Sequence, residues 1–399
     1  MRLSLLLACA AVFTFGCEKK TTNTDPKPAD VKQAVGDTPK PADAKPAEEV
    51  LLLGEVGSLT GSEAAFGVST RDGIAMAIDE ANEAGGVKGK KLAVRVYDDQ
   101  SKPEEAASAV TRLITQDKVL VILGEVASSN SLAMAPKAQE AKIPMISPSS
   151  TNPKVTEVGD YIFRVCFIDP FQGYVMAKYS HDELKFKDVA ILTDKKSAYS
   201  EGLTEVFKRK FTEMGGKISG VESYAKGDTD FRAQLTNIKK LRPQGLYVPG
   251  YYQDVAVIAE QARELGLKVT MMGGDGWDSA KLFELGGTAV VGSYVSNHYS
   301  ADDPSPRVQE FIKKYQARYK TTPDSLAALG YDAARVAIDA MKRATELTGP
   351  AIRDQIATTK DFPGVAGTIT LDANRNPVKP AVVLKVEEGK FTYVSTVAP

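Results

Sequence analysis

Short apolar runs alternate with amphipathic stretches along the first part of the chain beyond residue 50. The apolar runs cover residues 51–53, 92–97, 119–123 and 144–146, and each is followed by glycine, serine or aspartate. Between the first two runs, apolar side chains recur three or four positions apart at Ile74, Ile78 and Ala81. This pattern predicts β-strands that alternate with α-helices. Such alternation is typical of an α/β fold, in which helices cover both faces of a parallel sheet.

The same pattern starts again after residue 185. Further apolar runs cover residues 189–192, 218–224, 246–248 and 269–272. The segment 83–89 (EAGGVKG) resembles 213–220 (EMGGKISG), and both link a predicted helix to a predicted strand. We therefore expect two lobes of similar architecture. Helices at 308–319 and 336–344 are predicted to return to the first lobe, and a hairpin at 381–395 to complete the second.

The first 48 residues differ from the rest of the chain. Residues 3–15 are apolar but fall short of the roughly 20 residues that span a bilayer, so residues 1–16 are predicted to be a signal peptide. Gly16 and Cys17 resemble the lipobox of bacterial lipoproteins, in which the cysteine is lipidated. Residues 6–9 (LLAC) match that pattern better but leave too short an apolar region, and secretion without lipidation is the alternative. Residues 17–48 would then form the lipidated cysteine and a tether rich in Lys, Pro and Ala.

The overall composition and net charge do not indicate a class of binding partner, so the partner must be identified from individual residues. The chain is 43% hydrophobic and 25% charged, as in soluble globular proteins. Its 50 basic and 51 acidic residues give a net charge of −1, which favours neither nucleic acid nor an anionic membrane. Cys166 lies among apolar residues and is predicted to pack in the core. With two histidines and no GxSxG, HExxH or CxxC motif, we expect no catalytic site, cofactor or metal.

Three polar loops follow predicted strands, at 124–131 (GEVASSNS), 147–153 (SPSSTNP) and 273–279 (GGDGWDS). In open parallel sheets, ligands bind beyond the carboxyl ends of the strands, where helix N-termini also point. Hydroxyl and N–H groups in the first two loops suit a carboxylate, and Asp275 in the third suits an ammonium group. The alternatives are that Ser129 and Asn130 only cap their own helix and that residues 148–153 form a plain turn. Together the three loops predict a site for a zwitterion.

Aromatic residues follow predicted strands of the second lobe. Tyr199 lies in the segment 194–199, Tyr251 in 250–252 and Trp277 beside Asp275. Aromatic rings at equivalent strand ends can cover an apolar ligand side chain, although each ring alone is equally consistent with packing.

From residue 50 to 397 the chain resembles the type I periplasmic solute-binding proteins of the branched-chain amino acid (Leu/Ile/Val) family of ABC transporters. The resemblance rests on the order and spacing of GSLTG, Phe66-Gly67, the GGVKG turn, YDD, the serine loop at 124–131, ISPSSTNP, YSEG, GYY and GGDGWDS. It implies two Rossmann-like lobes joined by a three-strand hinge. We place lobe 1 at residues 49–169 plus 299–378, and lobe 2 at residues 170–298 plus 379–399.

The resemblance also implies roles for individual residues. Ser128, with the Thr151 N–H, would bind the ligand carboxylate. The Ser149 carbonyl, the Thr151 hydroxyl and Asp275 would bind the ammonium group. The side chains that line the remainder of the site would be Phe66, Ser150, Tyr199 and Tyr251.

The predicted protein is a monomeric lipoprotein, anchored by lipid in the periplasm, that closes its lobes on an amino acid and delivers it to an ABC permease. Hydrophobic or branched-chain amino acids are the expected ligands, and amides or other small organic solutes are the alternative. A sensor that reports to a membrane receptor would need the same residues. An enzyme is disfavoured because the usual nucleophile, base and metal-binding sets are missing from the sequence.

Overall fold

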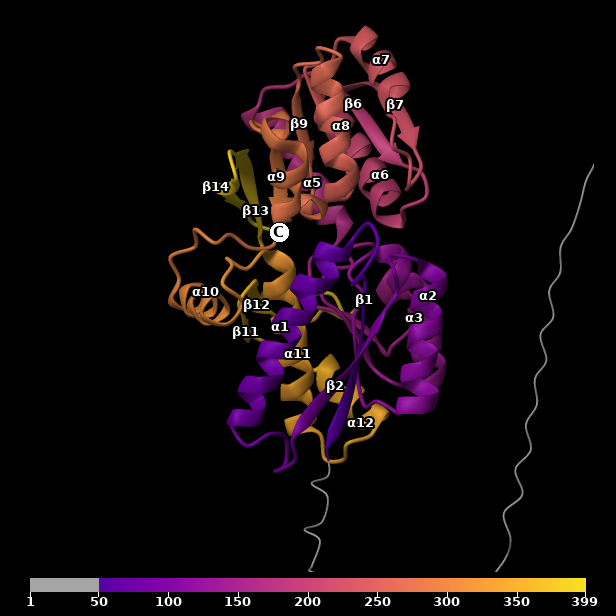
Figure 1. Cartoon of the computed structure of the whole chain (residues 1–399), viewed down its shortest axis with the longest axis vertical. Helices are drawn as coiled ribbons and strands as arrows, with labels where there is room; N and C mark the ends of the chain where they lie inside the picture. Colours follow the sequence, from indigo (N-terminus) through magenta and orange to yellow (C-terminus); the bar gives the residue numbers. More distant parts are fainter. Residues whose placement is uncertain (1–49) are drawn as a thin grey trace, which may run out of the picture. The chain divides into compact units, whose positions relative to one another are not determined.

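The computed structural model describes residues 50–399, so the predictions for the signal peptide, Cys17 and the tether fall outside the described residues. Two separate sheets, each flanked by helices, make up most of this region (Figure 1). We call the elements that pack on each sheet the first and second lobe. No helix in the described region is long and apolar enough to span a bilayer.

The first sheet is fully parallel, with strand order β2-β1-β3-β4-β5. Its strands are β1 (Leu51–Gly57), β2 (Leu92–Asp98), β3 (Ile122–Leu123), β4 (Met145–Ser147) and β5 (Ile162–Arg164). The helices between them are α1 (Ala64–Glu83), α2 (Pro103–Arg112), α3 (Ser128–Ala141) and the short α4 (Lys154–Glu157). A π-helical turn, η1 (Leu113–Asp117), follows α2.

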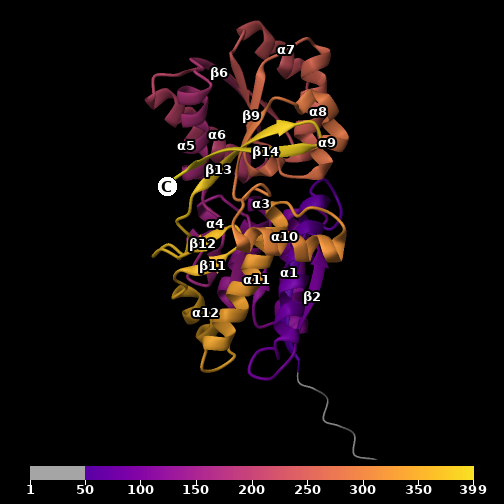
Figure 2. The same ribbon diagram turned by 90° about the vertical axis from the view of Figure 1, so that its left-hand side faces the viewer.

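The second sheet has the order β14-β13-β10-β9-β8-β6-β7. Its parallel strands are β6 (Asp188–Asp194), β7 (Lys217–Tyr224), β8 (Gly245–Tyr247), β9 (Thr270–Gly273) and β10 (Tyr294–Asn297). The antiparallel hairpin of β13 (Ala381–Glu387) and β14 (Lys390–Val397) extends it, drawn in yellow in Figure 2. The flanking helices are α5 (Asp169–Lys178), α6 (Ala198–Glu213), α7 (Arg232–Leu241), α8 (Tyr252–Glu264) and α9 (Ala280–Gly286). Shorter turns are η2 (Tyr179–Glu183), η3 (Asp275–Trp277) and η4 (Gly287–Val290).

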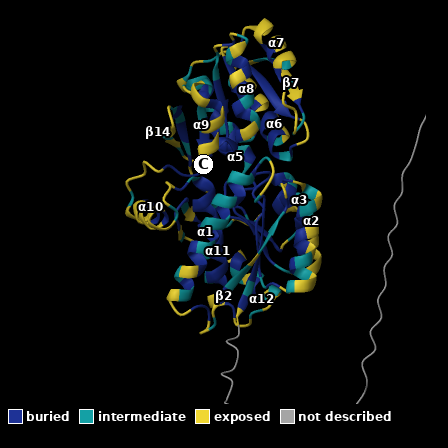
Figure 3. Cartoon of the chain, in the orientation of Figure 1, coloured by how far each residue is buried: buried dark blue, intermediate teal, exposed yellow. Residues whose placement is uncertain are grey.

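The chain then returns to the first lobe, as predicted. The returning elements are α10 (Pro306–Tyr319), α11 (Ser325–Arg343), α12 (Gly349–Ala357) and the small hairpin of β11 (Phe362–Gly364) and β12 (Gly367–Ile369). Their apolar side chains share one core with β1 and α1. Helix α11 is buried along most of its length (Figure 3). It lies so close to α1 that a Cβ at Gly73 would come within 2.0 Å of the Ala327 carbonyl oxygen.

Three connections join the sheets, at residues 165–168, 298–305 and 370–380. The predicted α/β class with two helix-flanked sheets is confirmed, while the division at 169, 298 and 378 stays a prediction. Every predicted strand is present, although the run 119–123 forms a strand only at its end. Strands β5 and β10 were not predicted, because each is short and contains polar residues.

Candidate functional site

A narrow cavity lies between loops of the two lobes. Six of the eight residues predicted to bind ligand line it: Phe66, Ser128, Ser149, Tyr199, Tyr251 and Asp275. The other lining residues are Val126, Gly276 and Leu326, which the sequence analysis did not identify. The structure therefore brings the three predicted loops together at one place.

The first lobe contributes the start of α3 to this cavity. Ser128 is buried at the first helical position, and its hydroxyl accepts a hydrogen bond from the Asn152 N–H at 3.2 Å. The N-cap position, Ala127, makes no side-chain cap, so the capping role considered for Ser129 and Asn130 is wrong. The Ser129 hydroxyl instead accepts from the Ala198 N–H of the second lobe at 3.1 Å. The N–H groups of this helix start suit an anionic oxygen.

The loop after β4 is held by its own serines. The Ser147 hydroxyl donates to the Glu125 carbonyl at 2.7 Å and accepts from the Ser150 N–H at 2.9 Å. The Ser150 hydroxyl lies 3.0 and 2.9 Å from the carbonyl oxygens of Glu125 and Val126. Ser150 and Thr151 do not line the cavity. In this geometry Ser150 braces the two loops against each other and does not face a ligand.

Arg164, at the end of β5, also holds the loop after β4 in place. Its fully buried guanidinium donates to the backbone carbonyls of Ser150, Asn152 and Pro153, the latter two at 2.9 and 3.3 Å. A planar group with several donors can satisfy several carbonyls that curve around it. The conformation of residues 150–153 therefore depends on one buried side chain. The sequence pattern contained no signal for it.

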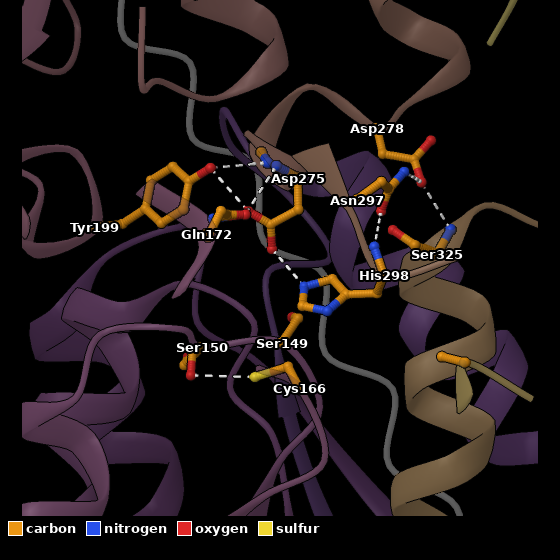
Figure 4. Close-up of polar contacts among 12 residues, drawn as sticks. Ser149, Ser150, Cys166, Gln172, Tyr199, Asp275, Asp278, Asn297, His298 and Ser325 are labelled. Carbon is orange, nitrogen blue, oxygen red and sulfur yellow. Dashed lines mark hydrogen bonds and ion pairs between the residues drawn. The ribbon is translucent and has the colours of Figure 1, made fainter. Parts of the chain in front are cut away.

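Asp275, in the turn after β9, is the acidic residue of the cavity, and three side chains form hydrogen bonds with it (Figure 4). Its Oδ1 accepts from Gln172 Nε2 at 2.9 Å and from the Tyr199 hydroxyl at 2.8 Å. Its Oδ2 lies 2.8 Å from His298 Nε2. Burial raises the pKa of Tyr199 well above 10, so its hydroxyl keeps the proton that it donates. The predicted acid is therefore held in one orientation by donors from α5, α6 and the connection after β10.

His298 and Gln172 are the main omissions of the sequence analysis. His298 is fully buried, and its ring stacks on Phe167 with centroids 3.6 Å apart. Burial lowers the pKa of His298 to about 4, although the neighbouring Asp275 opposes this shift. The signal that could have identified His298 is its place directly after a strand of the second sheet, which the sequence analysis did not recognise.

Aromatic and aliphatic side chains form the apolar part of the cavity. Tyr199 and Tyr251 stack with their ring centroids 5.1 Å apart, and Phe66 meets Tyr251 edge to face at 5.7 Å. Trp277, beside Asp275 in the sequence, is fully buried, does not line the cavity, and donates from Nε1 to the Val248 carbonyl at 2.9 Å. Val126 and Leu326 complete the apolar lining.

The burial of Cys166 and the grouping of the candidate metal-binding side chains bear on the chemistry that these residues can perform. Cys166 is fully buried, as predicted, and burial raises the pKa of its thiol to about 12, which excludes a thiolate nucleophile at neutral pH. Among the described residues, no group of His, Cys, Asp and Glu side chains could hold a metal ion.

Direct contacts link the two lobes around the cavity. Lys226, in the loop after β7, pairs through Nζ with Glu63 Oε1 at 2.5 Å and donates to the Ser101 carbonyl at 2.8 Å. Asn152 Nδ2 donates to the Ala198 carbonyl at 2.7 Å. These polar contacts depend on the present distance between the lobes.

Comparison with known proteins gives a consistent result. A family described as periplasmic binding protein matches residues 52–390. The leucine-binding protein LivK of Thermotoga maritima has a crystal structure that is 40% identical, with a TM-score of 0.84 over 88% of this chain and 99% of that chain. The branched-chain amino acid transporter substrate-binding protein LivJ of Streptococcus pneumoniae, in complex with isoleucine, is 34% identical, with a TM-score of 0.84 over 88% and 100%. A Pseudomonas aeruginosa protein that binds leucine, isoleucine, valine, threonine and alanine is 30% identical, over 75% of this chain and 80% of its own.

Proposed function

Because the chain belongs to the periplasmic binding protein family, whose members are solute-binding proteins and not enzymes, we propose that it binds a hydrophobic or branched-chain amino acid outside the cytoplasm for an ABC transporter. Relatives that carry the names of leucine, isoleucine and valine support this class of ligand.

The observation that carries the proposal is the arrangement of polar and apolar groups around one cavity. Ser128 and Ser149 lie in first-lobe loops, and Asp275 comes from the second lobe. A zwitterionic amino acid would place its carboxylate at the start of α3 and its ammonium group at Asp275. Its side chain would lie against Phe66, Val126 and Leu326. The family resemblance also implies contacts from Thr151, but this residue does not line the cavity, so we leave it out of the proposed contacts.

Ligand release requires the lobes to separate, because the residues that line the cavity come from both. Hinge movement at the three connections would break the contacts that Ser129, Asn152 and Lys226 make across the lobes. A ligand that contacts both lobes shifts the population toward the closed form by its differential affinity. The closed protein would then deliver the amino acid to a permease as a monomer. Lipidation at Cys17 and the tether at 17–48 would keep it at the membrane.

A thermal-shift screen of the purified protein with all amino acids, their amides and small organic acids tests the proposal. A ligand at 100 times its Kd adds about 2.7 kcal/mol to the free energy of unfolding. We expect leucine, isoleucine or valine to give the largest shift. Asp275→Asn should abolish the shift, whereas Asp339→Asn at a partly exposed position on α11 should retain it. If an amide or a plain organic acid binds and no amino acid does, the ligand assignment is wrong.

A further inference from the structure

We infer that His298 is a positioning residue that orients Asp275 while remaining uncharged, so that the site selects solutes with a free ammonium group over otherwise identical carboxylic acids. This inference rests on the proposed function and specifies how the same cavity recognises its ligand.

The geometry places His298 where it can act on the ligand cavity through Asp275. His298 does not line the cavity, while Asp275 does. Its Nε2 lies 2.8 Å from Asp275 Oδ2, and its ring is held against Phe167. The backbone is fixed as well, because the His298 N–H donates to Asn297 Oδ1 at 2.7 Å. Asn297 Nδ2 in turn donates to Asp278 Oδ2 at 2.8 Å, a contact drawn in Figure 4.

The second ring nitrogen indicates the charge of His298. Nδ1 is buried and has no hydrogen-bond partner among the described residues. In the neutral tautomer with the proton on Nε2, Nδ1 carries only an unpaired lone pair. A charged ring would bury an N–H donor of a cation without an acceptor, which costs considerably more. The contact is therefore a hydrogen bond from a neutral imidazole to a carboxylate.

Among the described residues, Asp275 forms no ion pair with a lysine or an arginine, and its one contact of this kind is with His298. The titratable groups that interact electrostatically with Asp275 or His298 come from α5, α6, β8, the start of α8 and the connections after β5, after β9 and before β13: Asp169, Cys166, Tyr199, Tyr247, Tyr251, Asp278 and Lys379. Gln172 also donates to Asp275, and Arg164 interacts with the neighbouring Cys166 and Asp169. Gln172 and Tyr199 are neutral donors. Burial raises the pKa of Asp169 to about 8, so this carboxyl group is mostly protonated near neutral pH. Burial lowers the pKa of Lys379 to about 8, so its ammonium group keeps most of its charge at pH 7, but its Nζ donates to the Ala366 carbonyl at 2.9 Å and its main electrostatic partner is Asp332. The guanidinium of Arg164 is already engaged by the carbonyls of Ser150, Asn152 and Pro153.

The consequence is a requirement on the ligand. Three neutral donors do not offset the negative charge of a carboxylate, so the carboxylate repels a ligand that brings only another carboxylate. A protonated His298 would cancel that charge and would admit the deaminated acid. The neutral state of the His298 ring thus makes the site bind an amino acid more tightly than the corresponding 2-oxo acid.

NMR on the wild-type protein tests the charge of the ring directly. The chain has two histidines, so ¹⁵N spectra of the imidazoles contain two spin systems, and His181→Gln assigns them. We expect His298 to show the neutral tautomer protonated at Nε2 from pH 8 to pH 5.5, with and without leucine. A doubly protonated His298 ring at pH 7 would overturn the inference.

Binding measurements test the consequence for selectivity. We expect wild type to bind leucine at least 100-fold more tightly than 4-methyl-2-oxopentanoate, with a leucine Kd that is constant between pH 7 and 5.5, below the range in which Asp169 titrates. His298→Leu removes the donor and should raise the leucine Kd by roughly 10- to 100-fold. His298→Gln keeps a neutral donor and should recover much of that loss. If His298→Leu does not fold, His298→Gln and the NMR spectra of wild type decide the question.

The possible failures are distinguishable. If wild type binds no amino acid, the proposed function fails and the inference fails with it. If wild type binds leucine but also binds the 2-oxo acid within a few-fold, only the inference fails. Equal leucine Kd values for wild type and His298→Leu likewise contradict the positioning role alone.

Discussion

At the scale of single residues, the orientation of Asp275 depends on donors that do not all contact a ligand. Tyr199 has two functions, because its ring stacks on Tyr251 and its hydroxyl donates to Asp275. The hydroxyl also accepts from the Gly276 N–H at 3.0 Å. The phenol therefore links the acidic side chain to the backbone of its own turn.

Tyr199→Phe should keep the stacked ring and remove this link. A hydrogen bond to a charged group contributes about 1.5–3 kcal/mol, so the leucine Kd should rise roughly 10- to 100-fold. Tyr247→Phe is the matched control, because the Tyr247 hydroxyl is equally buried and has no hydrogen-bond partner among the described residues. Isothermal titration calorimetry compares the two variants, and an equal effect of both would contradict the role assigned to Tyr199.

The site residues that could be predicted from sequence are polar residues in loops that follow predicted strands. Ser128 and Asp275 follow apolar runs and carry groups that a zwitterion needs. Gln172 and His298 could not be predicted, because an isolated glutamine or histidine has no pattern and acquires its role only when distant segments meet. Leu326 resembles any buried leucine in sequence. Its position at the cavity follows from the packing of α11 against other elements. The hydrophobic periodicity of the local sequence does not predict that packing.

At the scale of secondary-structure elements, the shape of the loop after β4 is set by β5. Arg164 is the last residue of that strand, and its guanidinium is surrounded by carbonyls of residues 150–153. A buried arginine in a three-residue strand also explains why the sequence did not predict β5: the run is short and its last residue is charged. Helix α5 was missed for a related reason, since its sequence includes Pro170 and Gly173.

Arg164→Lys should therefore weaken both folding and binding. Lysine keeps the charge but cannot donate to several carbonyls in one plane, so buried acceptors lose their partners. We expect the free energy of unfolding to fall by about 2–4 kcal/mol and the leucine Kd to rise several-fold. Arg209→Lys, on the exposed side of α6, is the control and should change neither quantity. Urea denaturation and calorimetry give the two readouts, and an unchanged Kd in a destabilised Arg164→Lys variant would show that the loop keeps its shape without the guanidinium.

At the scale of the whole molecule, loss of contact with water raises the pKa of several carboxyl groups. Burial raises the pKa of Glu55 to about 8, of Asp169 to about 8, and of Asp254 and Asp324 to about 7. In each case the folded state holds a proton that the unfolded chain has already released near pH 4. The free energy of unfolding must then decrease as pH rises toward 8.

This decrease is measurable between pH 6.5 and pH 8, a range above the transition of His298. Glu55→Gln removes one of these groups, so its stability should decrease less steeply with pH, by up to about 1.4 kcal/mol per pH unit. Glu83→Gln at the exposed end of α1 serves as the control. Urea denaturation at three pH values is sufficient. If Glu55→Gln has the pH dependence of wild type, Glu55 is ionised in the folded protein.

The contacts that join the lobes belong to the same scale, and they are the part of the molecule that sequence patterns predict least. The apolar runs predicted both sheets, and the return of α10 and α11 to the first lobe is confirmed by their shared core. No pattern predicted that Lys226 would pair with Glu63. The Glu63 carboxylate is nearly fully buried, and its pKa is raised by burial while Lys226 opposes the shift. Separation of the lobes would remove the lysine from that carboxylate.

Lys226→Met should therefore favour the open form and weaken ligand binding. Lys226 is about one-third exposed, so solvent screens the pair and the loss should be modest, with a leucine Kd raised roughly 3- to 10-fold. Lys217→Met is the control, because Lys217 lies on the same β7 and pairs with Asp188 of its own lobe. Small-angle scattering with subsaturating leucine should show a larger radius of gyration for Lys226→Met than for Lys217→Met. In this account the ion pair affects binding through lobe closure. A raised leucine Kd without a change in the radius of gyration would therefore contradict the role assigned to Lys226.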